Sequence, residues 1–186
     1  MKEPVFLTDD ELKHYADEHI GYELTMLSWC TGLLIAIGEM RSKGYIPLAT
    51  HNAVLNSYSM HSRNLIDFLY LREMKRDRDT DIVVQDYIEE NALFDRLIPI
   101  TKRLCDAKKK ADKQVAHLTR DRMDYIDETK SWDVAGIVAD IYNAFRSIRD
   151  LFPEKRTTVE FRSRFSDEGF LVPRIDAEAL DRKSVV

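Results

Sequence analysis

Polar side chains able to do acid–base chemistry occur in two segments of the sequence. Residues 60–70 contain His61 and Asn64, and residues 112–122 contain His117. An imidazole exchanges its proton near neutral pH, so it can act as a general acid or base. If the two segments lie on neighbouring helices, His61, Asn64 and His117 can line one polar pocket between them.

Cationic side chains accompany these histidines and can hold an anion. At about 100° per residue, Lys113 and Arg120 share a polar stripe with His117, and Lys113 completes the predicted pocket. On the other helix, His61 lies beside the apolar face and Arg63 points nearly away from it. In the functional interpretation an imidazole acts as acid or base, and Arg120 or Lys113 holds an anion. The structural interpretation is a hydrogen-bond network, because buried polar side chains usually satisfy one another.

Other chemistry is not indicated by the sequence. His14 and His19 are five residues apart and diverge on a helix, so we expect no metal site and no cofactor. Cys30 and Cys105 have no metal-ligand spacing and are predicted to be reduced core thiols. The pair Arg63 and Asp67, four residues apart, predicts an ion pair on a helix surface.

The composition favours helices. The chain of 186 residues contains six Gly and five Pro, while 44% of it is apolar and 33% charged, which suits one helical domain better than many short strands. The formal net charge of −5 is unevenly spread, since residues 102–122 hold eight bases and three acids. Such a basic helix can meet RNA, or it can meet acidic groups of its own fold or of a second subunit.

Periodicity predicts an all-α fold, a bundle of four long helices. Thr8 to Glu11 form a capping box, from which a helix can run to a glycine cap at Gly44. Further helices are predicted from about residue 50 to 75, from 101 to 122, and from an N-cap at Ser131 to just before Pro153. The predicted apolar stripes of the last three helices comprise Val54, Tyr58, Leu65, Phe68 and Leu69, then Leu104, Ala107, Ala111, Val115 and Leu118, and then Val134, Val138, Ile141, Phe145, Ile148 and Phe152.

The predicted domain boundary falls after this fourth helix. Residues 1–153 form the helical domain, and residues 154–186 form a C-terminal extension that packs on the domain or on a partner. The extension contains Phe161, Phe165, Phe170 and Leu171, which is more apolar side chain than a disordered tail usually has. Within it, residues 157–161 are expected to be a short strand or an extended arm.

The two polar segments also carry a resemblance. Residues 61–70 (HSRNLIDFLY) and 113–122 (KQVAHLTRDR) resemble a group of bacterial helical-bundle proteins that is in turn similar to the HEPN superfamily. The resemblance implies a compact helical bundle, homodimers and, in many members, metal-independent RNA cleavage. The sequence departs from the HEPN nuclease signature, in which His follows Arg after about four to six residues. Phe68, Leu69 and Tyr70 stand where that histidine would follow Arg63.

Two functions follow as alternatives. The first is a protein that acts by association, as a homodimer, with a polar pocket between its helices. The second is a HEPN-like, metal-independent endoribonuclease with a degenerate motif, for which RNA is the partner. It would use His117 as general base, with Arg63 and Arg120 stabilising the charge of the phosphate. No secretory signal is indicated, and residues 26–37 are too short an apolar stretch to span a membrane. We therefore expect a cytoplasmic protein without a membrane partner.

Overall fold

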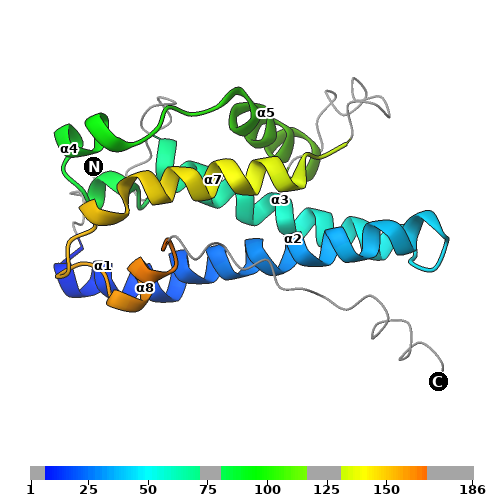
Figure 1. Ribbon diagram of the computed structural model, residues 1–186, viewed down its shortest axis with the longest axis horizontal. Coiled ribbons are helices and arrows are strands. Elements are labelled where there is room, and N and C mark those ends of the chain that lie inside the picture. The colour runs from blue at the N-terminus through cyan, green and yellow to red at the C-terminus, as the bar shows by residue number, and fades with distance from the viewer. Residues whose placement is uncertain (1–6, 72–80, 117–130, 167–186) are drawn as a thin grey trace, which may run out of the picture.

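The computed structural model describes residues 7–71, 81–116 and 131–166, and these ranges contain helices and turns but no strand. The predicted all-α class is therefore confirmed. The longest helices lie along the same direction and give the molecule an elongated shape (Figure 1).

One continuous helical rod opens the fold. It consists of α1 (Asp9–Tyr15), the π-helical segment η1 (Ala16–Ile20) and α2 (Gly21–Ser42). A π-helical segment changes the angular register of the helix. The irregularity in the rod lies just before Gly21.

Both predicted ends of the rod are confirmed. The Thr8 hydroxyl accepts a hydrogen bond from the backbone N–H of Glu11, and the Glu11 carboxylate accepts one from the Thr8 N–H at 2.8 Å. This reciprocal pair satisfies backbone donors that the first helical turn leaves open. At the other end Gly44 has φ of 78°, the left-handed conformation that glycine adopts without steric cost.

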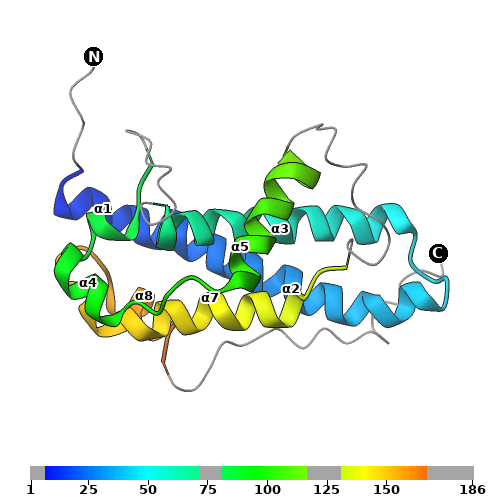
Figure 2. The same cartoon turned by 90° about the horizontal axis from the view of Figure 1, so that it is seen from above.

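The chain then reverses into α3 (Leu48–Tyr70). The helix begins at Leu48, after the N-cap residue Pro47, which is two residues earlier than the sequence predicted. The helices α2 and α3 pack along their length as an antiparallel hairpin, with the turn between them at one end of the molecule (Figures 1 and 2). On α3, Tyr58, Leu65, Phe68 and Leu69 are buried as expected, and Val54 is half-buried.

Two further helices cover one side of this hairpin. Helix α5 (Lys102–Lys110), continued by the π-helical segment η3 (Ala111–Ala116), packs on α3, and α7 (Val134–Ile148) packs on α2, α3 and α5. Figure 2 shows α5 crossing α3 at a steep angle while α7 runs along the hairpin. The predicted stripe of α7 is confirmed, since Val138, Ile141, Phe145 and Ile148 are buried.

Short helices complete the described fold. They are η2 (Val84–Asp86), α4 (Glu90–Arg96), η5 (Arg149–Leu151) and α8 (Val159–Ser163). Because residues 159–163 are helical and capped by the Thr158 side chain, the predicted strand or arm over 157–161 is wrong. The N-cap of α7 is Asp133, whose carboxylate accepts from the Gly136 N–H at 3.0 Å, so the predicted cap at Ser131 is wrong too.

The described part of the C-terminal extension packs into the core. Phe165 stacks on Phe145 with ring centroids 4.8 Å apart, and Phe145 stacks on Phe68 at 5.8 Å. Phe161 and Phe165 are fully buried. Phe170 and Leu171 lie outside the described residues. The aromatic column formed by Phe68, Phe145 and Phe165 therefore joins α3, α7 and the segment after α8.

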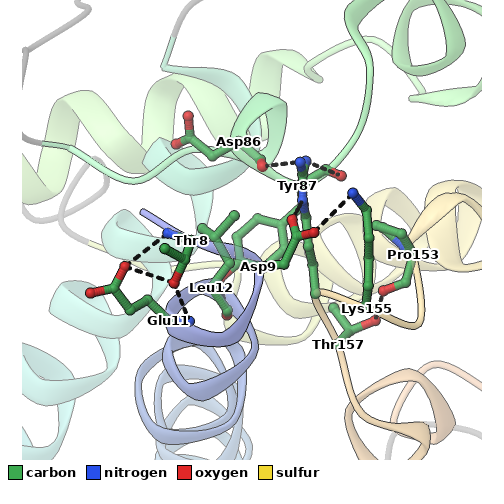
Figure 3. A network of polar contacts seen from close by, with 10 residues as sticks. Thr8, Asp9, Glu11, Leu12, Asp86, Tyr87, Pro153, Lys155 and Thr157 are labelled. Atoms are coloured by element: carbon green, nitrogen blue, oxygen red, sulfur yellow. Dashed lines mark hydrogen bonds and ion pairs between the residues drawn. The ribbon is translucent and has the colours of Figure 1, made fainter. Parts of the chain in front are cut away.

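A polar clasp holds this extension to the start of the rod. Arg156 donates to the Asp9 carboxylate at 2.6 Å and to the backbone carbonyl of Asp86 at 2.9 Å, and the Lys155 ammonium lies 2.9 Å from Asp9 (Figure 3). Asp9 is thus shared by two cations, and their hydrogen bonds lower its pKa below the ordinary value. We call Asp9, Lys155 and Arg156 the N-terminal clasp.

Candidate functional site

The two predicted site residues His61 and Asn64 meet at one carboxylate. With its proton on Nδ1, His61 donates to Glu23 Oε2 at 2.7 Å, and Asn64 Nδ2 donates to Glu23 Oε1 at 3.1 Å. The Tyr22 ring packs edge-on against the His61 ring, with centroids 5.7 Å apart. We call Tyr22, Glu23, His61 and Asn64 the Glu23 cluster. Its members come from α2 and α3, so the antiparallel hairpin assembles it.

The Glu23 cluster is polar but largely shielded from water. The His61 side chain is 12% exposed and that of Glu23 is 23% exposed. A carboxylate behind an imidazole orients the ring and fixes its tautomer, as it does for a general base. The same contacts also satisfy both oxygens of a part-buried carboxylate. The same contacts therefore fit two roles. They can orient His61 for acid–base chemistry, or they can hold Glu23 in place between α2 and α3.

A second polar cluster lies on the α5 side of α3. Arg63 donates to Asp112 Oδ1 at 2.5 Å, while Lys108 Nζ lies 2.5 Å from Asp67 Oδ1 and 3.6 Å from Asp112 Oδ2. Arg63 also approaches Asp67, at 4.0 Å. We call these four residues the ion network. Two cations alternate with two carboxylates, so the network is formally neutral.

Lys108 is the most deeply buried member of the ion network. Its side chain is 5% exposed, and it approaches Asp67 Oδ1 as an ion-pair contact without the direction of a well-formed hydrogen bond. An ammonium in such a place needs a charged partner, because burying an unpaired charge is very costly. The network thus fixes α5 and η3 on α3.

This arrangement corrects two interpretations of Arg63. Its side chain is 23% exposed and faces η3, so it does not point away from the core. The pair of Arg63 and Asp67 is part-buried and shared with Lys108 and Asp112, so it is not a simple surface ion pair. The error arose because a single-helix projection contains no information about the helix that packs beside it.

The predicted site residues are thus divided between two clusters. His61 and Asn64 belong to the Glu23 cluster, and Arg63 belongs to the ion network. Lys113 is half-buried on η3. His117 and Arg120 lie outside the described residues, so the structure does not test whether they join either cluster.

Three charged participants and the Tyr22 ring were missed from the sequence. Glu23, Lys108 and Asp112 each look like ordinary surface charges when a helix is read alone. The available signal was the excess of charge on predicted buried arcs, since Lys108 follows Ala107 and Asp112 follows Ala111 on the face that meets α3. A buried charge at such a position requires an opposite charge on the neighbouring helix.

The basic helix α5 is largely neutralised by its own chain. Arg103 contacts Asp133 at 3.0 Å and Asp140 at 3.3 Å. Lys110 lies over the Trp132 ring, 5.0 Å from its centroid, and burial lowers the Lys110 pKa. Arg103 and Lys110, like Lys108 in the ion network, therefore meet acids or an aromatic ring within the protein.

The described residues also include possible metal ligands and the two cysteines. Within 7–71, 81–116 and 131–166, no group of three His, Cys, Asp or Glu side chains is placed to hold a metal ion. Cys30 is buried as predicted, but Cys105 is exposed, so its assignment to the core is wrong.

The rod Asp9–Ser42 is long and apolar enough to cross a membrane on length and composition alone. Half of its most apolar 18-residue window is buried inside the molecule. A core helix of a water-soluble fold passes the same test, so this property is weak evidence for a membrane span.

Comparison with known proteins adds no relative to this description. No family model, no curated protein and no solved structure matches the chain.

Proposed function

We propose that this chain is a cytoplasmic protein that acts by association, as a homodimer, on a HEPN-like arrangement of four long helices. The observation that carries the proposal is the surface of α2. Tyr22 and Trp29 on one face are each 53% exposed, and Ile35, roughly 120° away around the helix, is 59% exposed. Large apolar side chains gathered on one exposed helix are typical of an interaction surface.

The two polar clusters support association over catalysis. The arginine that a phosphate would require, Arg63, is already neutralised by Asp112, and the His61 ring already holds Glu23. Replacing these partners with a substrate would leave part-buried carboxylates without their hydrogen bonds. In the proposal, both clusters hold helices together.

The C-terminal extension does not support a dimer. It was expected to pack on the domain or on a partner, and its residues Phe161 and Phe165 are buried in the core of their own chain. The proposal therefore rests on α2.

The alternative function is a HEPN-like, metal-independent endoribonuclease, and one observation favours it. Arg63 from residues 61–70 contacts Asp112, which immediately precedes residues 113–122 and lies five residues before His117. Segment η3, which contains the start of residues 113–122, also packs on α3, which contains residues 61–70. The ribonuclease proposal needs His117 as base, with Arg63 and Arg120 at the phosphate.

Two measurements separate the functions. Light scattering at tens of micromolar should give the mass of a dimer, and a monomer there would contradict the association proposal. Incubation with total RNA and a tRNA pool in the presence of a chelator should leave the RNA intact. Cleavage that His117→Ala abolishes would establish the ribonuclease instead, whereas cleavage unaffected by His117→Ala would point to a contaminant.

A further inference from the structure

Helix α2 carries a regular apolar seam on a face that the described helices do not bury. Its residues recur at alternating steps of four and three, which is the a/d spacing of helices that pack side by side along their length. The members are Tyr22, Met26, Trp29, Leu33, Ala36 and Met40. We call them the α2 seam.

The seam is distinct from the core face of the same helix. Leu24, Leu27 and Leu34 are between 0% and 6% exposed. By contrast, Tyr22 and Trp29 are about half exposed and the other four seam residues are half-buried. The seam extends over the 19 residues from Tyr22 to Met40, roughly 27 Å at a rise of about 1.5 Å per residue. It is long enough for several layers of interlocking side chains.

Helix α2 itself supplies no charge to the middle of the seam, since no Asp, Glu, Lys or Arg occurs between Glu23 and Glu39. One cation from another segment lies beside the seam, because Arg164 donates to Thr25 Oγ1 at 3.1 Å. The Glu23 carboxylate points to α3, where His61 and Asn64 occupy both of its oxygens. The Glu23 cluster thereby directs this carboxylate toward α3, and His61, which holds it, also packs against the Tyr22 ring.

We propose that the α2 seam packs against the α2 seam of a second copy of this chain, with Trp29 near the middle of the interface. This inference rests on the proposed homodimer and names its surface. A closed two-fold dimer requires a self-complementary patch, and an a/d seam meets that requirement because each side chain fits between those of an identical helix.

The lack of charge determines which partner fits. Helices that select a different partner usually do so through charged residues beside the seam, and like charges would make two identical seams repel. Residues 24–38 of α2 include no charged side chain, and the described cation beside the seam, Arg164, lies near its Tyr22 end, at Thr25. The part of the seam from Trp29 to Ala36 therefore offers no like charge of α2 to an identical copy.

The test compares two exposed aromatic side chains. Trp29→Glu puts a carboxylate in the middle of the proposed interface, and Phe94→Glu puts one on α4, where Phe94 is 88% exposed. We expect Trp29→Glu to weaken dimerisation roughly 100-fold or more, because a charge without a partner is buried. Phe94→Glu should keep the mass of the parent. Light scattering and sedimentation across a dilution series measure both.

A second measurement uses the seam without a charge substitution. The chain has two tryptophans, so Trp132→Phe leaves Trp29 as the only one. If the inference is correct, dilution below the dissociation constant shifts Trp29 emission to the red and increases its quenching by acrylamide. This readout remains informative if Trp29→Glu fails to fold.

The outcomes distinguish the inference from the proposed function. A dimer that persists in Trp29→Glu, with Trp29 emission unchanged on dilution, overturns the seam but leaves the homodimer. A parent that is monomeric at tens of micromolar overturns both. Monomeric parent protein in which Trp29 is shielded at every concentration would mean that residues 167–186 of the same chain, or another molecule, cover the seam.

Discussion

Helices α7 and α2 differ in how much of their apolar surface is buried within the chain. On α7 the apolar residues share one face and are buried, while Asn143 and Arg146 on the opposite face meet solvent. On α2 apolar residues occur on every face, and Trp29 and Ile35 are left exposed. An amphipathic helix such as α7 is complete within its own chain. A helix that is apolar all round and lies at the edge of a fold indicates a second surface to be covered.

The largest expected effect is the loss in free energy of unfolding when a buried aromatic side chain of α7 is truncated, compared with an exposed one of α2. Phe145 on α7 is fully buried and stacks between Phe68 and Phe165. Truncating it in Phe145→Ala should reduce the free energy of unfolding by about 3 to 5 kcal/mol, through lost burial and the cavity left behind. Urea denaturation measures the loss.

The matched substitution on α2 is Trp29→Ala. Because Trp29 is half exposed, its removal should change the unfolding of the dilute monomer by less than about 1 kcal/mol. If the two variants lose equal stability in dilute solution, the contrast between a closed face and an open face is wrong.

The same contrast shows what sequence periodicity can predict. The stripe of α7, the capping box at Thr8 and the glycine turn at Gly44 depend on residues close together in the chain, and all three are confirmed. Each follows from steric and hydrogen-bonding rules that act within one element.

The polar clusters depend on residues far apart in the chain. The pairs Glu23–His61 and Arg63–Asp112 join positions separated by 38 and 49 residues. A projection of one helix shows which residues lie on its flank, but not which flank of the next helix faces them. The π-helical segments at 16–20 and 111–116 also shift the angular register, so a constant 100° per residue places the residues after them incorrectly.

The next effect concerns the ion network, which lies on the side of the hairpin that α5 and α7 cover. We call this the closed side, and the side that carries the α2 seam the open side. Replacing Lys108 in Lys108→Met removes the ammonium that Asp67 and Asp112 share. We expect a loss of roughly 2 to 3 kcal/mol. That is below the 3 to 5 kcal/mol typical of a broken buried pair, because both carboxylates retain Arg63 and partial access to water.

A double variant sharpens this result. Adding Asp67→Asn to Lys108→Met removes the uncompensated charge, so part of the lost stability should return. If the double variant is less stable by the sum of both single losses, Lys108 and Asp67 are not coupled and the ion network does not hold α5 in place.

A smaller loss is expected at the edge between the closed and open sides. In His61→Ala, Glu23 loses its imidazole donor while keeping Asn64, so the free energy of unfolding should fall by about 1 to 3 kcal/mol. Dimerisation should also weaken, since the carboxylate beside Tyr22 is then less firmly held.

The comparison variant is His117→Ala. We predict that it changes RNA cleavage or the binding of RNA or another ligand more than it changes the free energy of unfolding. Its predicted neighbours Lys110, Lys113 and Arg120 should disfavour the imidazolium form and keep the ring neutral. An equal or greater stability loss in His117→Ala than in His61→Ala, with no change in RNA binding or cleavage, would make His117 a structural residue.

The smallest effect is a pH dependence at the N-terminal clasp, which holds the segment that supplies Phe161 and Phe165 to the closed side. Hydrogen bonds from Arg156 and then Lys155 lower the pKa of Asp9 below its ordinary value of 3.8. The folded state therefore binds the Asp9 proton less tightly than the unfolded chain does. The resulting stabilisation is fully present above about pH 4 and is lost as the pH falls through the lower, folded pKa.

In Asp9→Asn, stability at neutral pH should be slightly below that of the parent, and the two proteins should converge as the pH falls through the folded pKa of Asp9. The difference should be small because Arg156 keeps its hydrogen bonds to the carbonyls of Asp86 and Tyr87. Thermal melts of both proteins between pH 2.5 and 7 measure it. A gap that widens toward low pH would mean that the Asp9 carboxylate does not stabilise the clasp through its charge.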